Sequence, residues 1–567
     1  MENKNQEIEK SHDTIILILK ENRFEVEKQK LISKSQYFAA LLSENYLDYR
    51  QTEYIIKYDN ILPISFRDFV DWIHNDKIDI FTTNCWDIKK CDRLSILVEL
   101  SIIFAVNNLI EYLIYKIEEK LYFMPPEYVI NLWLLSQELS LNILQDISLA
   151  FCLDRFDDLP LNSIYELSKE NFLKLIGNIN ITSTKSYLLK ITNKWMAHHN
   201  DFTIALDILK NKETKILHSI ISCENRDSDN TEKFIHCWDG NDFFELTSFK
   251  YPEDIVNCYT DKYKLEGMQI IGRRYNFYLC GGEFGDTGIF NKNVWRYSLI
   301  TKKWFLETIM PTERRNMIAA FVKNKLILVG GLGHEIKSNI DIYDIYTGLW
   351  TSGAEAPCNF YCGHFYSVLD EKLIICRKFL ATYNLCNTKA LRYKSKNDYE
   401  SYGLKCKIYI YFSNMNVWKM VSRTEKSYLN FNVDLYTTIL FKTAPCYIDI
   451  VNKDKMFLRV ANDSCNKKKC SHIMRYNNRI EFKLSSYKTF NKEDSILYFL
   501  KKINYDNNYD DVIVYLDLSE LCYKNTLHLH SIPIKNINKF QSCLHKFNRF
   551  FNIIHPDHLH ATNLNHI

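Results

Sequence analysis

The chain contains few residues whose types and spacing could perform chemistry. Cys465, Cys470 and His472 are ligand types that zinc accepts, and they lie close together in the sequence. A second close pair of ligands is missing, and the lysines at 467–469 would repel a cation. The histidines within 555–560 are interpreted as part of a polar tail. We therefore expect neither a metal site nor a cofactor.

Motifs of catalysis are also missing from the sequence. It has no Gly-rich phosphate loop, no Gly-x-Ser-x-Gly turn and no His-Glu-x-x-His pair. These motifs mark common nucleotide-dependent, hydrolytic and zinc-dependent enzymes. We therefore expect a binding protein without enzymatic activity.

The amino-acid composition limits the kinds of partner and the compartment that we expect for this chain. With 72 basic and 69 acidic side chains the net charge is +3, so no overall field attracts nucleic acid or an anionic membrane. The 17 cysteines are odd in number and irregularly spaced, which favours a reducing compartment over a disulfide framework. The polar N-terminal residues carry no apolar run long enough for a signal or membrane segment. We expect a protein of the cytoplasm, or of the nucleus, that binds neither nucleic acid nor membrane.

One pattern occurs twice between residues 278 and 350. A short apolar run ends in a glycine pair, a polar loop follows, and a tyrosine and a tryptophan come next with six residues between them. The glycine pairs are 49 positions apart and the tryptophans 46. The two copies are Gly281, Gly282, Tyr297, Trp304 and Gly330, Gly331, Tyr343, Trp350. Short strands that repeat about every fifty residues are typical of propeller blades.

This pattern resembles the kelch repeat, although two unrelated hairpins would also produce it. The resemblance implies an all-β propeller of six blades over residues 234–567, with both tryptophans buried between blades. The next blade is less regular, because Cys376 and Arg377 replace the glycine pair. Either an insertion within 380–407 splits that blade, or a degenerate blade near Tyr383 intervenes.

The first 123 residues show a mixed pattern of strands and helices. The apolar run 13–19 predicts a strand, Asn22 and Arg23 a turn, and the apolar spacing from Ser33 a helix. A second strand at 53–57 and a helix at 66–73 follow. This order resembles a BTB (POZ) domain, an α+β fold; an unrelated small α+β domain is the alternative. The resemblance implies a homodimer.

Residues 124–222 have helical spacing of apolar residues that continues to Trp195. Their place between the two other regions resembles the all-α BACK domain of kelch-like proteins. The polar residues 223–233 are interpreted as a linker. The fold class is therefore multidomain: α+β, then all-α, then all-β.

Three residues could bind a cullin. Tyr46, Leu47 and Asp48 follow the helix that starts near Ser33. They match the hydrophobic–any–acidic pattern of BTB proteins that bind cullin-3, while a polar loop with an incidental tyrosine is the alternative. An apolar side chain of this kind would enter a groove of the partner.

The combined resemblance to BTB–BACK–kelch proteins implies a substrate adaptor of a cullin-3 ubiquitin ligase. The substrate, an unknown protein, would meet the loops after the glycine pairs, where Glu283, His334 and Glu335 are candidate contacts. The alternative function is a scaffold that binds actin or another cytoskeletal partner without a role in ubiquitin transfer.

Overall fold

A computed structural model describes most of the chain. It covers residues 14–43, 51–58, 60–82, 85–209, 216–223, 232–238, 243–255, 265–285, 287–335, 338–360, 365–369, 371–380, 404–423, 437–441, 444–452, 455–460, 471–475, 496–505, 508–517, 529–533, 551–556 and 559. The chain divides into two compact units, which are described separately. One unit consists of residues 1–215 with 556–567, and the other of residues 216–555.

The first unit begins with a three-stranded sheet in the order β2-β1-β3. Its strands are β1 (Thr14–Leu19), β2 (Asn22–Glu27) and β3 (Glu53–Ile56), with β3 parallel to β1. Burial alternates along each strand, so one face of the sheet packs on the core. The predicted turn at Asn22 and Arg23 is wrong, because both residues belong to β2 and the turn lies at Lys20 and Glu21.

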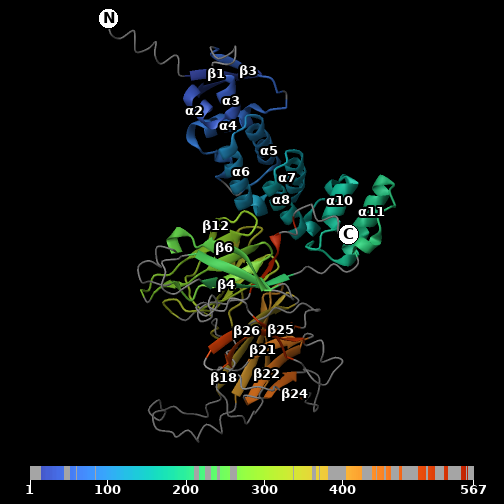
Figure 1. Cartoon of the computed structure of the whole chain (residues 1–567), viewed down its shortest axis with the longest axis vertical. Helices are drawn as coiled ribbons and strands as arrows, with labels where there is room; N and C mark the ends of the chain where they lie inside the picture. The colour runs from blue at the N-terminus through green and yellow to red at the C-terminus, as the bar shows by residue number, and fades with distance from the viewer. Residues whose placement is uncertain are drawn as a thin grey trace. The chain divides into compact units, whose positions relative to one another are not determined.

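Helices pack against this sheet and continue beyond it (Figure 1). The helices of this part are α2 (Lys28–Lys34), α3 (Gln36–Leu41), α4 (Pro63–Asn75), η2 (Asp79–Phe81), α5 (Ile88–Ile103), α6 (Asn107–Lys120) and η3 (Leu121–Phe123). Their core is aromatic, with Phe38, Phe66, Phe69 and Phe104 all fully buried. The predicted α+β fold of this region is confirmed.

From Pro126 to Leu209 this unit is helical, as the sequence predicts. Its helices are α7 (Pro126–Glu138), α8 (Asn142–Asp154), η4 (Phe156–Asp158), α9 (Leu161–Tyr165), α10 (Lys169–Ile176), α11 (Lys185–His199) and η5 (Leu206–Leu209). Trp195 of α11 stacks on Phe172 of α10, with 4.7 Å between ring centroids, and its indole N–H donates to the Leu167 carbonyl at 3.0 Å. The buried tryptophan thus joins the last helices.

The second unit consists of antiparallel sheets in chain order. The first contains β4 (Ile216–Cys223), β5 (Glu232–Trp238), β6 (Phe243–Lys250) and β28 (Phe551–Ile554). The second contains β8 (Gln269–Arg273), β9 (Asn276–Cys280), β11 (Asn293–Ser298) and β12 (Trp304–Ile309). The third contains β13 (Ile318–Val322), β14 (Lys325–Val329), β15 (Ile340–Asp344) and β16 (Leu349–Ser352).

Three further sheets follow. The fourth contains β17 (Phe365–Leu369), β18 (Lys372–Leu380), β19 (Leu404–Phe412) and β20 (Val417–Arg423). The fifth contains β21 (Thr437–Phe441), β22 (Ala444–Asn452), β23 (Lys455–Val460) and β24 (Ser471–Arg475). The sixth contains β25 (Ile496–Tyr505), β26 (Asn508–Asp517) and β27 (Leu529–Pro533), and β7 (Leu265–Glu266) with β10 (Glu283–Phe284) forms a separate ribbon.

Neighbouring sheets meet through corresponding strands. Strand β28 contacts β8, β8 contacts β13, β13 contacts β17, and β17 contacts β21. Apolar side chains fill the space between sheets: Phe249 packs on Phe277, and Ile342 and Leu373 belong to one buried apolar cluster. These facts establish several antiparallel sheets; a closed ring is not established, and the six-bladed propeller stays a prediction.

Two expectations from the sequence can be compared with the structure here: where the first sheet begins, and how the strands around residues 380–407 pair. Strand β4 begins at Ile216 and pairs with β5, so the sheets start before the linker predicted at 223–233. Strand β18 pairs directly with β19 from Lys372–Phe412 to Leu380–Leu404. Strands β18 and β19 therefore belong to one sheet, as the interpretation with an insertion within 380–407 expects. Tyr383 itself lies outside the described residues.

Candidate functional site

The predicted cullin-binding residues Tyr46, Leu47 and Asp48 lie outside the described residues, between α3 and β3. The elements on both sides are well anchored. Ser35 caps α3 by accepting a hydrogen bond from the Phe38 N–H at 3.1 Å. Its hydroxyl also donates to the Phe104 carbonyl at 2.6 Å, which ties the start of α3 to the end of α5.

Two half-exposed tyrosines flank this region. The rings of Tyr37 and Tyr58 meet Phe104 edge-on, with centroid distances of 5.4 and 6.5 Å. Phe104 in turn stacks on Phe38 at 5.0 Å. Tyr37 and Tyr58 remain 42% and 43% exposed. A rigid aromatic core therefore holds two tyrosines at the surface of this domain.

An ion pair fixes α4 against α5. The guanidinium of Arg93 binds both carboxylate oxygens of Asp68, with nitrogen–oxygen distances between 2.6 and 3.0 Å. Burial raises the pKa of Asp68 and outweighs the opposite effect of Arg93. The pair is an internal support for the helices and leaves no free charge for a ligand.

The glycine pairs of the repeat are positioned by close backbone contacts. Gly281, Gly282, Gly330 and Gly331 all have positive φ. The N–H of Gly282 donates to the Arg314 carbonyl at 3.0 Å, and the N–H of Gly331 to the Phe360 carbonyl at 2.7 Å. Each pair therefore binds the segment that leads into the following sheet.

The aromatic residues of the repeat also reach neighbouring sheets. Tyr297 and Tyr343 are buried, and their hydroxyls donate to the Ser248 carbonyl and to Glu307. The indole N–H groups of Trp304 and Trp350 donate to the Lys250 carbonyl at 2.7 Å and to the Thr308 hydroxyl at 2.9 Å.

The expectation that both tryptophans are buried is wrong, because each is only partly buried. They lie on β12 and β16, which are edge strands of their sheets. Tyr411 and Trp418 repeat the arrangement in the fourth sheet, and the Trp418 N–H donates to the Ala354 carbonyl at 3.2 Å.

Sequence reasoning missed the buried charges between these strands. Arg296 and Glu307 form an ion pair at 2.7 Å, with side chains only 2% and 6% exposed. Glu307 also accepts from Tyr343 at 3.2 Å, so it links two sheets. Arg314 pairs with Asp341, and burial lowers the pKa of Arg314. For Arg296 the available signal was an arginine between the large side chains of Trp295 and Tyr297 in β11, where a buried charge requires a partner.

The loops that follow the glycine pairs lie against each other. The rings of Phe290 and His334 meet edge-on at 5.4 Å, and Glu313 pairs with both Lys292 at 3.0 Å and His334 at 3.2 Å. His334 and Glu335 are exposed, so a partner could contact them.

Glu283 is buried instead. It pairs with Arg315 at 2.9 Å and accepts from the Gly288 N–H at 2.8 Å. Its role is to hold the loop, and it is not available as a contact residue.

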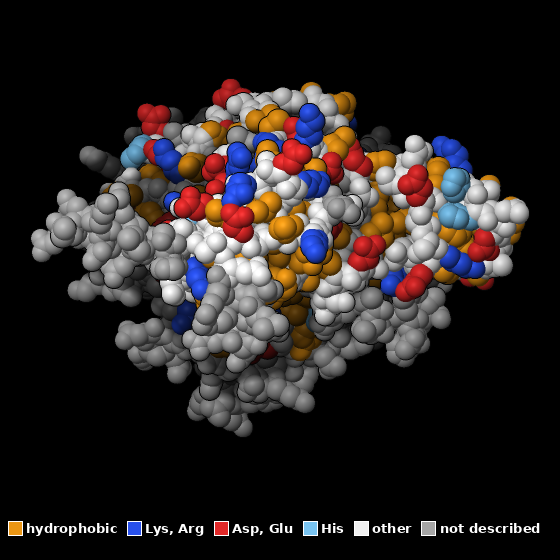
Figure 2. Space-filling model, turned by 90° about the horizontal axis from the view of Figure 1, so that it is seen from above, with side chains coloured by type: hydrophobic (Ala, Val, Ile, Leu, Met, Phe, Trp, Pro, Cys, Tyr) orange, Lys and Arg blue, Asp and Glu red, His pale blue; other side chains and the backbone are white. Residues whose placement is uncertain are grey.

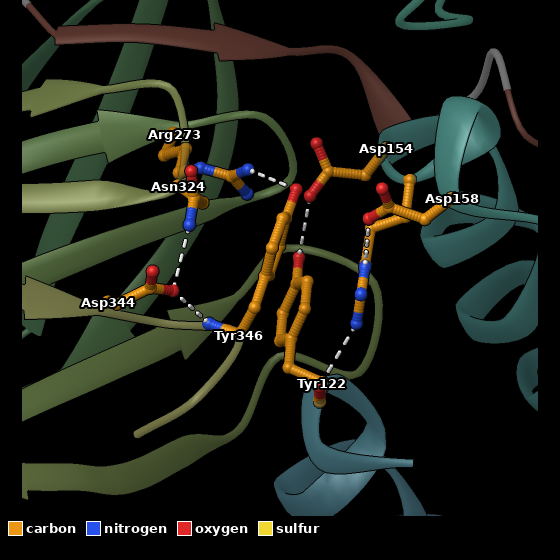
Figure 3. A network of polar contacts seen from close by, with 8 residues as sticks. Tyr122, Asp154, Asp158, Arg273, Asn324, Asp344 and Tyr346 are labelled. Carbon is orange, nitrogen blue, oxygen red and sulfur yellow. Dashed lines mark hydrogen bonds and ion pairs between the residues drawn. The ribbon is translucent and has the colours of Figure 1, made fainter. Parts of the chain in front are cut away.

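Polar contacts also join hairpin turns at the opposite ends of these strands (Figure 3). Arg273 donates to the Lys323 carbonyl at 2.9 Å and to the Tyr346 hydroxyl at 3.2 Å. Asp344 accepts from the Asn324 amide at 2.8 Å and from the Tyr346 N–H at 2.9 Å. These turns are thus held by their own side chains.

Within the helical unit, a second set of contacts joins η3 to α8 and η4. The Tyr122 hydroxyl donates to Asp154 at 3.2 Å (Figure 3). Arg155 donates to Asp158 at 2.8 Å and to the Tyr122 carbonyl at 3.3 Å.

Among the described residues we looked for a metal site and for a surface that would attract a ligand of a single charge sign. Among them, no group of three or more His, Cys, Asp and Glu side chains could hold a metal. Basic and acidic side chains are interspersed on the face seen in Figure 2. No helix in the described part of the chain is both long and apolar enough to cross a membrane.

Comparison with known proteins identifies one region. The model of the BTB/POZ domain family matches residues 3–117. No curated protein matches the chain.

Proposed function

Residues 3–117 form a BTB/POZ domain, and on this basis we propose that the protein is a substrate adaptor of a cullin-3 ubiquitin ligase. BTB domains typically mediate dimerisation and cullin-3 binding. In this proposal the protein performs no chemistry. It holds a substrate beside the ligase, and a dimer adds avidity because the second contact becomes intramolecular.

The cullin site is proposed at Tyr46, Leu47 and Asp48. The supporting observation is their position in the sequence between two anchored elements, α3 and β3. The aromatic core around Phe104 presents Tyr37 and Tyr58 beside these elements, so a partner would meet a preorganised surface.

The helices α7–α11 and the sheets from β4 onward are proposed as BACK-like and kelch-like regions. Contacts between the first strands of successive sheets support a propeller, as does the pairing of β28 with β4. The substrate is proposed to meet the loops with His334 and Glu335, which are exposed and carried by an internally bonded scaffold.

Direct binding tests this proposal. The full-length protein should capture the purified N-terminal region of cullin-3 in solution. Replacing Tyr46 by alanine should weaken capture about thirtyfold or more, because a buried aromatic anchor contributes ~2 kcal/mol or more to an interface. Circular dichroism and thermal unfolding of the variant should match the parent.

A parent protein that does not bind cullin-3 would refute the adaptor role. Binding to actin filaments in that case would favour the cytoskeletal scaffold. Equal capture by parent and Tyr46→Ala would remove only this residue from the site.

A further inference from the structure

Helix α11 carries basic side chains and no acidic ones. Its 15 residues include three lysines and two histidines, but no aspartate or glutamate. One face of the helix is buried, with Leu188 and Trp195 at its centre. The lysines are all exposed, and they are Lys185, Lys190 and Lys194. The outward side of α11 is therefore a basic surface.

Other helices of the same unit pair their lysines with acidic residues. Lys174 of α10 binds Glu170 at 2.7 Å, and Lys116 of α6 binds Glu119 at 2.7 Å. Within the described part of the chain, no lysine of α11 takes part in an ion pair. The charges of α11 are thus left without the internal compensation that these helices have.

The acidic residues next to the two ends of α11 have other partners. Just before the helix, Asp157 accepts a hydrogen bond from the Ser183 hydroxyl at 2.6 Å. Just after it, Asp201 pairs with Lys169 of α10 at 3.0 Å. These contacts hold both carboxylates away from the lysines of α11.

The positions of the lysines do not favour the helix itself. Lys185 lies in the first turn, at the positive end of the helix dipole, where an acidic residue would be stabilising. Lys190 and Lys194 are four residues apart, so their like charges repel each other across one turn. The arrangement is unfavourable for α11 alone, and an acidic partner would compensate for it.

We propose that the exposed face of α11 binds an acidic segment of a partner protein. Lys190 and Lys194 are about 6 Å apart along the helix axis. Acidic residues at alternate positions of an extended chain are ~6.6 Å apart, so two of them can meet both lysines. Leu189 is 38% exposed and adds an apolar contact. This inference does not depend on cullin binding.

Anionic partners of other classes fit this face less well. Proteins that bind nucleic acid often contact about 6–10 phosphates, and basic segments that bind anionic membranes contain about 4–8 lysines or arginines. Helix α11 offers three lysines, and the whole chain has a net charge of only +3. The number of charges therefore favours a short acidic peptide.

The test replaces Lys190 and Lys194 together by glutamine. Glutamine is as good a helix former as lysine and removes the repulsion, so the variant should unfold at the same temperature or higher. The probe is a fluorescein-labelled peptide of alternating glutamate and serine, about sixteen residues long, so that its acidic residues have the required spacing. Fluorescence anisotropy on the full-length protein at low salt should show affinity about fivefold lower in the variant.

The matched control replaces Lys57 and Lys89 by glutamine. Both are exposed lysines of the same unit, away from α11 in the sequence, and the change in net charge is the same. This variant should bind the peptide as the parent does. The difference between the parent and the α11 variant should shrink at high salt, because exposed charges are screened. A peptide of alternating glutamine and serine should not bind.

Three results would overturn the proposal. The first is a parent that does not bind the acidic peptide, or binds it no better than the α11 variant does. The second is an equal loss in both double variants, because the effect would then reflect net charge alone. The third is tighter binding of the parent to a single-stranded oligonucleotide or to phosphatidylserine vesicles, lost in the α11 variant, which would assign the face to that partner. Capture of cullin-3 by the α11 variant should equal that of the parent, so the two proposals stand or fall separately.

Discussion

At the scale of single residues, the glycines after β9 and β14 are required by close contact as well as by backbone conformation. Gly330 has φ of 63°, and a Cβ added there would lie 2.2 Å from the Phe360 carbonyl oxygen. A Cβ added at Gly281 would lie 2.6 Å from the Arg314 carbonyl oxygen. Any side chain would push the next sheet away, so these positions set the spacing between sheets.

Replacing Gly330 by alanine should therefore destabilise the protein strongly. The strain of positive φ costs about 1 kcal/mol, and displacing the Phe360 carbonyl adds to it, for a total of roughly 2–4 kcal/mol. Urea unfolding measures the loss. Gly288→Ala is the control, because Gly288 has φ of 77° but only one neighbouring atom at 4.0 Å. Equal losses in the two variants would contradict the role of the contact.

Buried cysteines should resist modification. Burial raises the pKa of Cys280 to about 12, so at pH 8 its thiol stays protonated and shielded. Burial likewise raises the pKa of Cys91 to about 12. Cys85 is exposed. Iodoacetamide at pH 8 should modify Cys85 and leave Cys280 unmodified until urea unfolds the protein, as measured by peptide mass spectrometry; early labelling of Cys280 would show that its strand opens.

At the scale of elements, the last strand of each regular sheet binds the preceding sheet through its tryptophan. Trp350 of β16 donates to Thr308 of β12, and Trp304 of β12 donates to the Lys250 carbonyl of β6. Because the rings are partly exposed, their contribution should come from this bond as well as from packing. The edge strands are thereby held without a further strand beside them.

Trp350→Ala should cost about 2–3 kcal/mol, below the 3–5 kcal/mol typical of a fully buried large aromatic residue. Trp350→Phe keeps most of the ring contact and loses the hydrogen bond, which should cost about 1 kcal/mol. Chemical unfolding monitored by circular dichroism gives both values. Leu349→Ala, at a 63% exposed neighbour, should be nearly neutral. A loss as large at Leu349 would contradict this account of β16.

At the scale of the whole molecule, the two ends of the sheet unit are paired with each other. Ile216 of β4 lies opposite Ile554 of β28, and the N–H of Ile554 donates to the Arg274 carbonyl at 2.8 Å. Strand β28 also contacts β8 of the next sheet. The C-terminal strand therefore joins two sheets that are otherwise formed by the beginning of the unit.

Deleting residues 551–567 should consequently destabilise the sheet unit as a whole. The deletion removes β28 from beside β4 and β8, leaves β4 as an unpaired edge and uncovers apolar side chains, so we expect aggregation and loss of a cooperative unfolding transition. Calorimetry and size-exclusion chromatography measure these effects. Deletion of residues 561–567 alone keeps β28, so it should change neither the cooperative unfolding transition nor the aggregation state. A longer deletion that still unfolds cooperatively would contradict the role of β28.

Local patterns in the sequence were sufficient for part of this fold. Alternating burial in β1–β3, helical spacing up to Trp195 and the glycine–tyrosine–tryptophan repeat all depend on residues close in sequence. They predicted the α+β region, the helices and two regular sheets. Where the glycine pair is replaced, at Cys376 and Arg377, the sequence could not choose between an insertion and a degenerate blade.

The remaining features depend on residues far apart in the sequence. The partner of β4 lies near the other end of the chain, so no local pattern could separate this strand from the linker. The Glu307–Tyr343 contact likewise joins two sheets. At the candidate site, sequence similarity located Tyr46, Leu47 and Asp48, but only the fold brings Tyr37 and Tyr58 together around Phe104.

The pairing of β4 with β28 also sets the order of events during synthesis. Strand β4 emerges from the ribosome long before its partner, which is encoded roughly 340 residues later. At about 5–20 residues per second, β4 waits on the order of half a minute for β28. The nascent protein must therefore protect an open strand edge throughout this interval, and we expect it to depend on chaperones until its last residues are made.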